Sequence, residues 1–345
     1  MACIWVEGFE TFRSDAWLAL RYTEAGGAFS SVSGKNGGHG GASASSGGTQ
    51  LSATLLASPA STITVGAWVK LDSSPSATGK IGWTVLKAGV AQLTLRAIQS
   101  GDHEWKLELR LGGSSGTVIA TQTGSAQHVG TWYFVELQAT INTSTGAYEV
   151  RVNESAVMSD TGRNTANAGA NQFDGIQLRL SSQGVLDDVI VMDESGTALN
   201  DFTGPVSIEG IKPNGNGNQN DWTSSSGANY STVDEDSTGS LQTDRVYAIT
   251  LGDIDLYTYG NLSRSGSASV LAVMLASVCA MDASGTRDLK HRVRSGGSEA
   301  AATAFTVPDG TQRHFYDIYE ENPVAASAWT VTDVNAVEFG IEVAN

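Results

Sequence analysis

Apolar and polar residues alternate in short segments along most of this chain, and this pattern limits the folds that the chain can adopt. Between Thr62 and Leu71, apolar side chains occupy every second position, and threonine, glycine, tryptophan and lysine stand between them. A period of two puts the two sets on opposite faces of a β-strand. Comparable segments occur at 93–97, 105–111, 133–141, 148–152 and 176–180. The sequence therefore predicts a half-buried strand in each segment and an all-β fold.

Glycine supplies the turns that so many short strands need. The chain has 40 glycines and six prolines among 345 residues, and only 16% of its residues are charged. Glycine adopts the positive φ angles of tight turns without strain. Short strands at close spacing, with no segment suited to a long helix, indicate antiparallel sheets packed face to face. We expect a jelly-roll sandwich in the first half of the chain.

A change of pattern near residue 200 predicts two domains. A chain of this length is about twice the size of a typical domain. The apolar run Val185–Met192 is typical of a last strand, and the polar segment SGTALNDFTG follows it before a new strand at Phe202–Pro213. We expect a jelly roll at 1–200 and a second, smaller β-sandwich at 201–345, each folding separately.

Local patterns predict several further elements. In the first half, Ser14–Leu20 is the only helical pattern, and the glycine- and serine-rich tract Gly34–Gly48 predicts an exposed loop. In the second half, the uniformly apolar run Val270–Met281 predicts a central buried strand, and the mostly polar segment Pro213–Asp244 predicts a surface loop. The other elements expected there are a hairpin at 246–259, strands at 288–294, 315–319 and 337–343, and a short helical turn at 332–335.

The charge of the chain excludes two classes of partner. Twenty basic and 36 acidic residues give a net charge of −16. Such a chain repels phosphates rather than releasing counterions from them. The longest apolar run, at 270–281, is too short to span a bilayer, and the amino terminus lacks the basic and apolar regions of an export signal. We expect a soluble chain with no nucleic acid partner and no membrane insertion.

Four segments of the first half follow one another in a recognisable order. They are TVGAWVKL at 64–71, GTWYFVELQATI at 130–141, GAYEVRVNE at 146–154 and LDDVIVMD at 186–193. This order resembles the concanavalin A-like and laminin-G-like jelly rolls, although Glu154 stands where their hairpin usually has glycine. The resemblance implies the same fold that the alternation predicts.

Segments from both halves also resemble structural proteins of tailed bacteriophages. They are EGFETF at 7–12, LDDVIVMD at 186–193, FTGPVSIEGIKPNGNG at 202–217 and AWTVTDVNAVEFGIEV at 328–343. The resemblance implies a virion protein that is assembled in the host cytoplasm, contacts other virion proteins and forms a homo-oligomer. Our main hypothesis is a non-enzymatic structural protein on the exterior of the particle, as a capsid decoration, a neck protein or a tail-associated fibre.

The alternative hypothesis is an adhesin or receptor-binding protein whose jelly roll binds a host surface glycan. Jelly rolls bind sugars by stacking them on exposed aromatic side chains and by hydrogen bonds from polar groups. Trp105 alternates with leucines, which predicts a core position for it. Trp68 and Trp83 are the tryptophans that we expect to be exposed, and they are the candidate glycan-binding residues.

The sequence gives no support for catalysis or for a cofactor. The glucanase motif Glu-x-Asp-x-x-Glu is absent, and the adjacent Asp187 and Asp188 point to opposite faces of a strand. The five histidines form no metal-binding motif, and abundant serine alone does not indicate a Ser-His-Asp triad. Cys3 and Cys279 lie in different predicted domains, which favours buried free thiols. We expect a protein that is not an enzyme.

Two polar clusters in the second half have alternative interpretations. Asn214, Asn216, Asn218 and Asp221 resemble a calcium loop in their spacing, but neutral amides bind calcium weakly, so an Asn-Gly turn is the favoured interpretation. The basic residues form either a solvated strand face or a docking site for an acidic partner. This basic cluster consists of Arg287, Lys290, Arg292 and Arg294. Because it lies in the second domain, we expect that domain to be the anchor.

Overall fold

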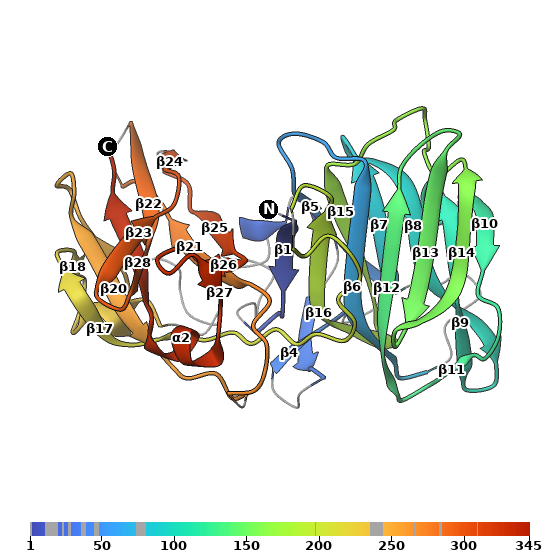
Figure 1. Cartoon of the computed structure of the whole chain (residues 1–345), viewed down its shortest axis with the longest axis horizontal. Coiled ribbons are helices and arrows are strands. Elements are labelled where there is room, and N and C mark those ends of the chain that lie inside the picture. The colour runs from blue at the N-terminus through green and yellow to red at the C-terminus, as the bar shows by residue number, and fades with distance from the viewer. Residues whose placement is uncertain are drawn as a thin grey trace. The chain divides into compact units, whose positions relative to one another are not determined.

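The chain folds into two compact units, Met1–Ile208 and Glu209–Asn345. The computed structural model describes residues 2–10, 20–22, 24–26, 29–35, 39–44, 48–73, 81–196, 198–234, 244–264, 266–282, 285–308 and 310–345. Strands make up nearly all of the regular structure in both units (Figure 1), which confirms the predicted all-β fold. The helix predicted at Ser14–Leu20 lies almost wholly outside the described residues. No helix in the described ranges has the length and apolar character needed to cross a membrane.

One layer of the first unit, which we call the front sheet, is built from strands that are far apart in the sequence. β15 is its centre, because β5 and β7 pair with the same residues of β15 from opposite sides. In spatial order the front sheet contains β2 (Glu24–Gly26), β5 (Gly48–Thr54), β15 (Gly175–Ser181), β7 (Gly82–Lys87), β8 (Val90–Gly101), β9 (Glu104–Leu111) and β10 (Thr117–Thr121), and β11 (Gln127–His128) also pairs with β9.

The second layer, the back sheet, is joined to the front sheet by a hairpin in which Ser181 pairs with Gly184. It begins with β1 (Cys3–Glu7) and β4 (His39–Ala44), which both pair with the same edge of β16, and β3 (Phe29–Ser33) pairs with β4. The remaining order is β16 (Gly184–Asp193), β6 (Thr62–Leu71), β12 (Trp132–Thr140), β13 (Gly146–Val152) and β14 (Ser155–Arg163).

The core of the first unit lies between these two sheets. The apolar positions that alternation predicts on β6, β8, β9, β12 and β15 are buried, except for Tyr133 and Leu111, which are half-buried. The rings of Trp105 on β9 and Tyr133 on β12 meet edge to face, 5.7 Å apart, and so connect the two layers. The jelly-roll sandwich predicted from alternation is therefore confirmed, and so is the core position of Trp105.

The segment 201–208 covers the outer face of the back sheet. The indole nitrogen of Trp68 donates a hydrogen bond of 2.8 Å to the carbonyl oxygen of Val206. The backbone nitrogen of Thr203 donates to Glu136, and that of Ile208 donates to Asp188. These contacts explain why the first unit extends eight residues beyond the boundary expected at residue 200.

Among its described residues, the second unit has one larger sheet and three small two-stranded sheets. The larger sheet has the order β17 (Pro213–Asn220), β20 (Ile254–Tyr259), β28 (Glu338–Val343), β22 (Thr286–Ser295) and β23 (Ser298–Ala301), with β24 (Phe305–Pro308) also paired to β22. The small sheets are β21 (Val273–Cys279) with β25 (Arg313–Tyr319), β18 (Thr223–Ser224) with β19 (Val246–Tyr247), and β26 (Glu321–Asn322) with β27 (Ser327–Ala328).

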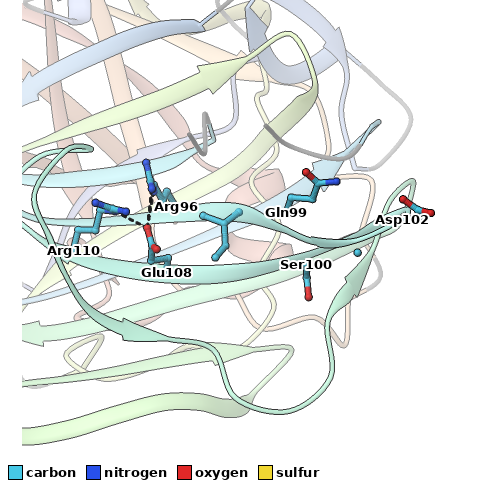
Figure 2. A pocket seen from close by; sticks show the side chains of 8 residues that line it. Arg96, Gln99, Ser100, Asp102, Glu108 and Arg110 are labelled. Carbon is cyan, nitrogen blue, oxygen red and sulfur yellow. Dashed lines mark hydrogen bonds and ion pairs between the residues drawn. The ribbon is translucent and has the colours of Figure 1, made fainter. Parts of the chain in front are cut away.

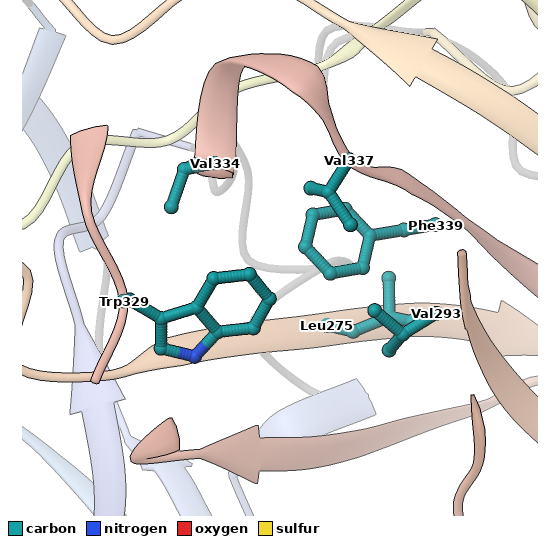
Figure 3. Packing of buried hydrophobic residues seen from close by; sticks show 6 residues of the cluster. All are labelled: Leu275, Val293, Trp329, Val334, Val337 and Phe339. Carbon is teal, nitrogen blue, oxygen red and sulfur yellow. The ribbon is translucent and has the colours of Figure 1, made fainter. Parts of the chain in front are cut away.

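An apolar cluster forms the main core of the second unit, and a short helix covers it (Figure 3). The helix α2 (Val331–Ala336) confirms the helical turn predicted there, and a 3₁₀ turn, η1 (Asn229–Thr232), is the other short helical element of this unit. A capping box between Thr330 and Asp333 satisfies the first backbone donors of α2. The cluster consists of Leu275, Val293, Trp329, Val334, Val337 and Phe339.

Several local predictions are wrong. The tract Gly34–Gly48 is not a loop throughout, because β4 runs through it with its last four residues buried. A Cβ on Gly41 would lie 2.5 Å from Val185, so only a small residue allows the close packing seen there. The Asn-Gly turn predicted at 214–218 lies within the strand β17, and therefore the segment 213–244 is not simply a surface loop.

Two predictions failed because alternation identifies strands and not their partners. The hairpin expected at 246–259 does not form, since β19 pairs with β18 while β20 pairs with β17 and β28. A strand does lie within Val270–Met281, but it is not central: β21 belongs to a two-stranded sheet with β25.

Candidate functional site

The outer face of the front sheet carries a line of polar residues that the strand register brings together. Arg179 on β15 lies opposite Gln50 on β5 and opposite Gly82 on β7. Gly82 in turn lies opposite Arg96 on β8, and Arg96 lies opposite Glu108 on β9. Directly opposed residues of antiparallel strands point to the same face of a sheet. We call these five residues the central row.

An ion-pair network occupies one end of the central row (Figure 2). Arg96 donates from Nε to Glu108 Oε1 over 2.9 Å, and Arg110 reaches the same oxygen from its own Nε at 2.5 Å. The side chains of Arg96, Glu108 and Arg110 are 6%, 10% and 17% exposed. Carbonyl oxygens of Ser114 and Gly116 accept further hydrogen bonds from the two guanidiniums. The network is therefore rigid and largely shielded from water.

Arg179 lies further along the central row and differs from Arg96. Its Nε is buried, and in the part of the chain that the structure describes its guanidinium has no hydrogen-bond or ion-pair partner. Burial and the nearby Arg96 charge both lower the pKa of Arg179. The guanidinium is thus held in a place where its positive charge is not compensated.

Gly82 separates the two arginines in the register and contributes no side chain to the row. Its φ angle is +143°, and a Cβ on it would lie 2.1 Å from the carbonyl oxygen of Leu95. No L-residue with a side chain fits there without moving the backbone. Between Arg96 and Arg179 the row therefore presents backbone and no side chain.

Two hollows lie near the central row. The larger, about 470 Å³, runs along β8 and β9 from Arg96 and Glu108 to Ser100 and Asp102 at the hairpin. The smaller, about 90 Å³, is lined by residues of β5, β7 and β15 that include Ser52 and Gln177. The face thus offers hydroxyl, amide, carboxylate and guanidinium groups around a shallow groove.

The two tryptophans predicted as glycan-binding residues lie elsewhere. Trp83 is 1% exposed and faces the core, so the prediction that it is exposed is wrong. Trp68 is half-buried on the outer face of the back sheet, where it donates to Val206 and packs edge to face on Phe134. The Lys35 ammonium lies 4.5 Å from its ring. The faces of both indoles are therefore occupied by the protein itself.

The polar clusters predicted in the second unit are engaged with neighbouring strands. Asn214 and Asn216 accept hydrogen bonds from Thr258 and from the backbone of Tyr230, and Asp221 accepts one from Ile254. The backbone nitrogen of Asn218 donates to Glu338. Within the described residues no group of three or more histidine, cysteine or acidic side chains is arranged to hold a metal ion.

The basic cluster on β22 faces glutamates on adjacent strands. Arg292 pairs with Glu299 at 2.6 Å and with Glu342 at 3.3 Å, and Arg294 pairs with Glu338 at 2.8 Å. Lys290 lies 3.9 Å from Glu342, whereas Arg287 lies opposite Val307 of β24. Most of its positive charge is therefore balanced within the second unit.

The structure also brings together a serine, a histidine and an aspartate that the sequence did not connect. His291 Nε2 lies 2.8 Å from Ser277 Oγ, and His291 Nδ1 lies 2.7 Å from Asp317 Oδ2. This is the connectivity of a catalytic triad. His291, however, is 1% exposed and its ring packs 5.0 Å from that of Phe305. Ser277 is half-buried and the Asp317 side chain is 30% exposed, so we interpret these hydrogen bonds as a partly buried link between β21, β22 and β25.

Carboxylates gather in the interior where β1 meets β16. Burial, followed by the charge of Asp188, raises the pKa of Asp187 to about 7. Burial also raises the pKa of Glu10 to about 9. Glu7, in contrast, forms a 2.8 Å ion pair with Arg21 and accepts a hydrogen bond from Tyr22. The fold therefore favours the uncharged forms of Asp187 and Glu10.

Comparisons with known proteins found solved structures whose fold is similar to that of part of this chain. No family model and no curated protein matches the sequence. The alginate lyase Aly36B is similar over 55% of this chain and 96% of its own, with 13% identity and a TM-score of 0.36. Domain 4 of an extracellular GH43 arabinanase from Geobacillus stearothermophilus, in complex with arabinotriose, is similar over 56% and 92%, with 19% identity and a TM-score of 0.37.

A third similar structure is the CBM2 module of the evolved Dit of Lactobacillus casei BL23 phage J-1. It is similar over 55% of this chain and 95% of its own, with 12% identity and a TM-score of 0.36. Carbohydrate-binding modules and a galectin are thus among the proteins with a similar β-sandwich.

Proposed function

We propose that the first unit is a non-catalytic carbohydrate-binding module that binds a glycan on the outer face of its front sheet. The observation that carries this proposal is the central row, with the groove of about 470 Å³ beside it. The outer face of the back sheet is covered by the segment 201–208, whereas the front sheet presents polar groups around a hollow.

The chemistry of this face suits a sugar. Each sugar hydroxyl both donates and accepts hydrogen bonds, and guanidinium, amide and carboxylate groups provide complementary donors and acceptors in fixed planes. Several of these groups are held in place by one another, as Gln177 is by its 3.0 Å hydrogen bond to Ser52. Fixed polar groups lose little entropy when a ligand binds. Jelly rolls are also a common lectin architecture.

The proposal includes no bond cleavage. Glycoside hydrolysis generally requires two carboxyl groups on opposite sides of the scissile bond. Glu108 is already engaged by two guanidiniums, and the other carboxylate of the groove, Asp102, lies at the far end, in the hairpin (Figure 2). This arrangement suits binding better than acid–base chemistry.

A glycan array and affinity electrophoresis with the full chain test the proposal. Ser100 is exposed on the groove, so Ser100→Leu fills part of it and removes a hydroxyl. We expect this variant to bind the selected glycan at least about 10-fold more weakly, the equivalent of about 1.4 kcal/mol. Ser159→Leu, at an exposed position on β14, is the matched control and should bind as the wild type does. Retention of no glycan by the wild type would refute the proposal.

We further propose that this module is displayed on the exterior of a tailed-phage particle. The support is the resemblance of four segments, taken from both units, to structural proteins of such phages. In this proposal the second unit anchors the chain to other virion proteins and the chain forms a homo-oligomer. Mass spectrometry of purified particles should detect the chain, and its absence from them would contradict this placement.

A further inference from the structure

The front face carries an excess of positive charge in a strongly acidic chain. Three arginines, Arg96, Arg110 and Arg179, lie in or beside the central row, and Glu108 is bonded to the first two. Arg96, Arg110 and Glu108 together therefore have a net charge of +1. Arg179 adds a second positive charge. The whole chain has a net charge of −16. This local charge is thus opposite in sign to that of the protein.

Leaving Arg179 without a partner costs stability. The buried Nε of Arg179 lacks an acceptor among the described residues, so it gives up the hydrogen bond that it makes to water in the unfolded chain. The position next to Arg96 adds repulsion between like charges, in agreement with the lowered pKa of Arg179. Replacement by an uncharged residue would relieve both costs. Both costs would be offset if a bound ligand placed a negative charge beside Arg179.

An anion that lies over the backbone at Gly82 would meet Arg179 on the neighbouring strand. Gly82 lies between the two arginines in the register, and its geometry excludes any side chain. The Arg96 guanidinium is already bonded to Glu108 and to the carbonyl oxygen of Ser114, so Arg96 adds attraction by its charge while Arg179 supplies the hydrogen bonds. Guanidinium groups bind planar or tetrahedral oxyanions through paired, charge-assisted hydrogen bonds.

We infer that the glycan bound by the front sheet carries an anionic substituent, a carboxylate or a sulfate, and that Arg179 binds this group. The inference rests on the proposed glycan-binding function and defines the class of glycan. The arginines are clustered on a few neighbouring strands, which suits a substituent on a sugar. A phosphodiester backbone would need cationic contacts along its whole length and would be repelled by the rest of the chain.

Matched polymers that differ only in charge test the inference. Polygalacturonate is compared with its methyl ester, and dextran sulfate with dextran, by affinity electrophoresis of the full chain. The pair that shows a difference identifies the group as carboxylate or sulfate. We expect the charged member of one pair to bind about 10- to 100-fold more tightly, the range of one or two charge-assisted hydrogen bonds.

Variants of Arg179 show whether this residue is responsible. Arg179→Gln should remove the preference for the charged polymer, and Arg179→Lys should retain part of it, because lysine keeps the charge but not the planar fork. Arg163→Gln makes the same charge change at an exposed position on β14 and should behave as the wild type. The thermal transition of each variant shows whether that variant is folded. If a variant does not fold, the binding of the wild type to the charged and the neutral polymers still tests the inference.

The two proposals fail in different ways. If the wild type binds neutral glycans as tightly as charged ones, the inference is overturned while glycan binding stands. The same holds if Arg179→Gln is folded and keeps the full preference for the charged polymer. If the wild type is retained by no polymer and by no glycan on the array, both proposals are overturned.

Discussion

Glu108→Gln should destabilise the first unit far more than an ordinary surface substitution does. This change removes the one negative charge that two guanidiniums share, and the three side chains are 6–17% exposed. Breaking a buried ion pair costs about 3–5 kcal/mol, because a charge stays buried without its partner. Glutamine keeps one acceptor, so we expect the lower end, about 3 kcal/mol. For a unit of this size that corresponds to a fall of about 6–12 °C in Tm.

Scanning calorimetry of the full chain measures this loss, and Glu149→Gln is the matched control. Glu149 pairs with Arg151 at 2.6 Å, a distance close to those in the network, but both side chains are 33% exposed. Water screens such a pair, and its loss should cost at most about 1 kcal/mol. Adding Arg110→Gln to Glu108→Gln should recover part of the stability, because one uncompensated charge is removed. Equal effects of Glu108→Gln and Glu149→Gln would refute the claim that the network is shielded.

Three further predictions concern the same unit. Gly82→Ala should cost about 2–4 kcal/mol, from backbone strain together with a clash against a carbonyl oxygen of β8, as measured by urea denaturation. Asp187→Asn should flatten the pH dependence of Tm between about pH 4 and 7. In this range the unfolded chain releases its proton while the folded chain keeps it, so the wild type loses stability as the pH rises, by at most about 4 kcal/mol. Trp68→Phe should cost about 1 kcal/mol in the same denaturation assay, since the carbonyl oxygen of Val206 loses its donor.

Each of these predictions has its own control. Gly162→Ala also places alanine at a positive φ angle, but with no atom within 4 Å of the added Cβ, so it should cost less than Gly82→Ala; the reverse order would contradict the steric argument. If the Tm of the wild type changes with pH in the same way as the Tm of Asp187→Asn, the pKa of Asp187 is not raised in the folded protein. Trp132→Phe, at another half-buried tryptophan of the back sheet, should be milder than Trp68→Phe.

The strands and the sandwich follow from the sequence because burial of one face leaves a clear alternation. Thr62–Leu71 is both predicted and observed as a strand, and the outward set on β9 can be read directly from Glu108 and Arg110 between leucines. Small residues are harder to interpret. The strand β4 consists of histidine, glycine, alanine and serine, and only its packing on Val185 shows why these residues are buried.

The candidate site depends on register, which alternation does not determine. The central row draws on five strands, and its members lie at positions 50, 82, 96, 108 and 179. A shift of one residue in any strand would point that member to the core. The sequence shows that Arg179 faces away from Leu178 and Leu180, but not that it meets Arg96. The predicted exposure of Trp83 is wrong for a related reason. Its residue type suggested exposure, whereas its position in the sandwich buries it.

The central row also has a length, because neighbouring strands lie about 4.8 Å apart. From Gln50 on β5 to Glu108 on β9 the row crosses four such intervals, or about 19 Å. A ligand lying across the strands therefore meets a new side chain at each interval, except above Gly82, where it meets backbone. A single sugar ring would reach only part of this row, whereas an oligosaccharide could contact it from end to end.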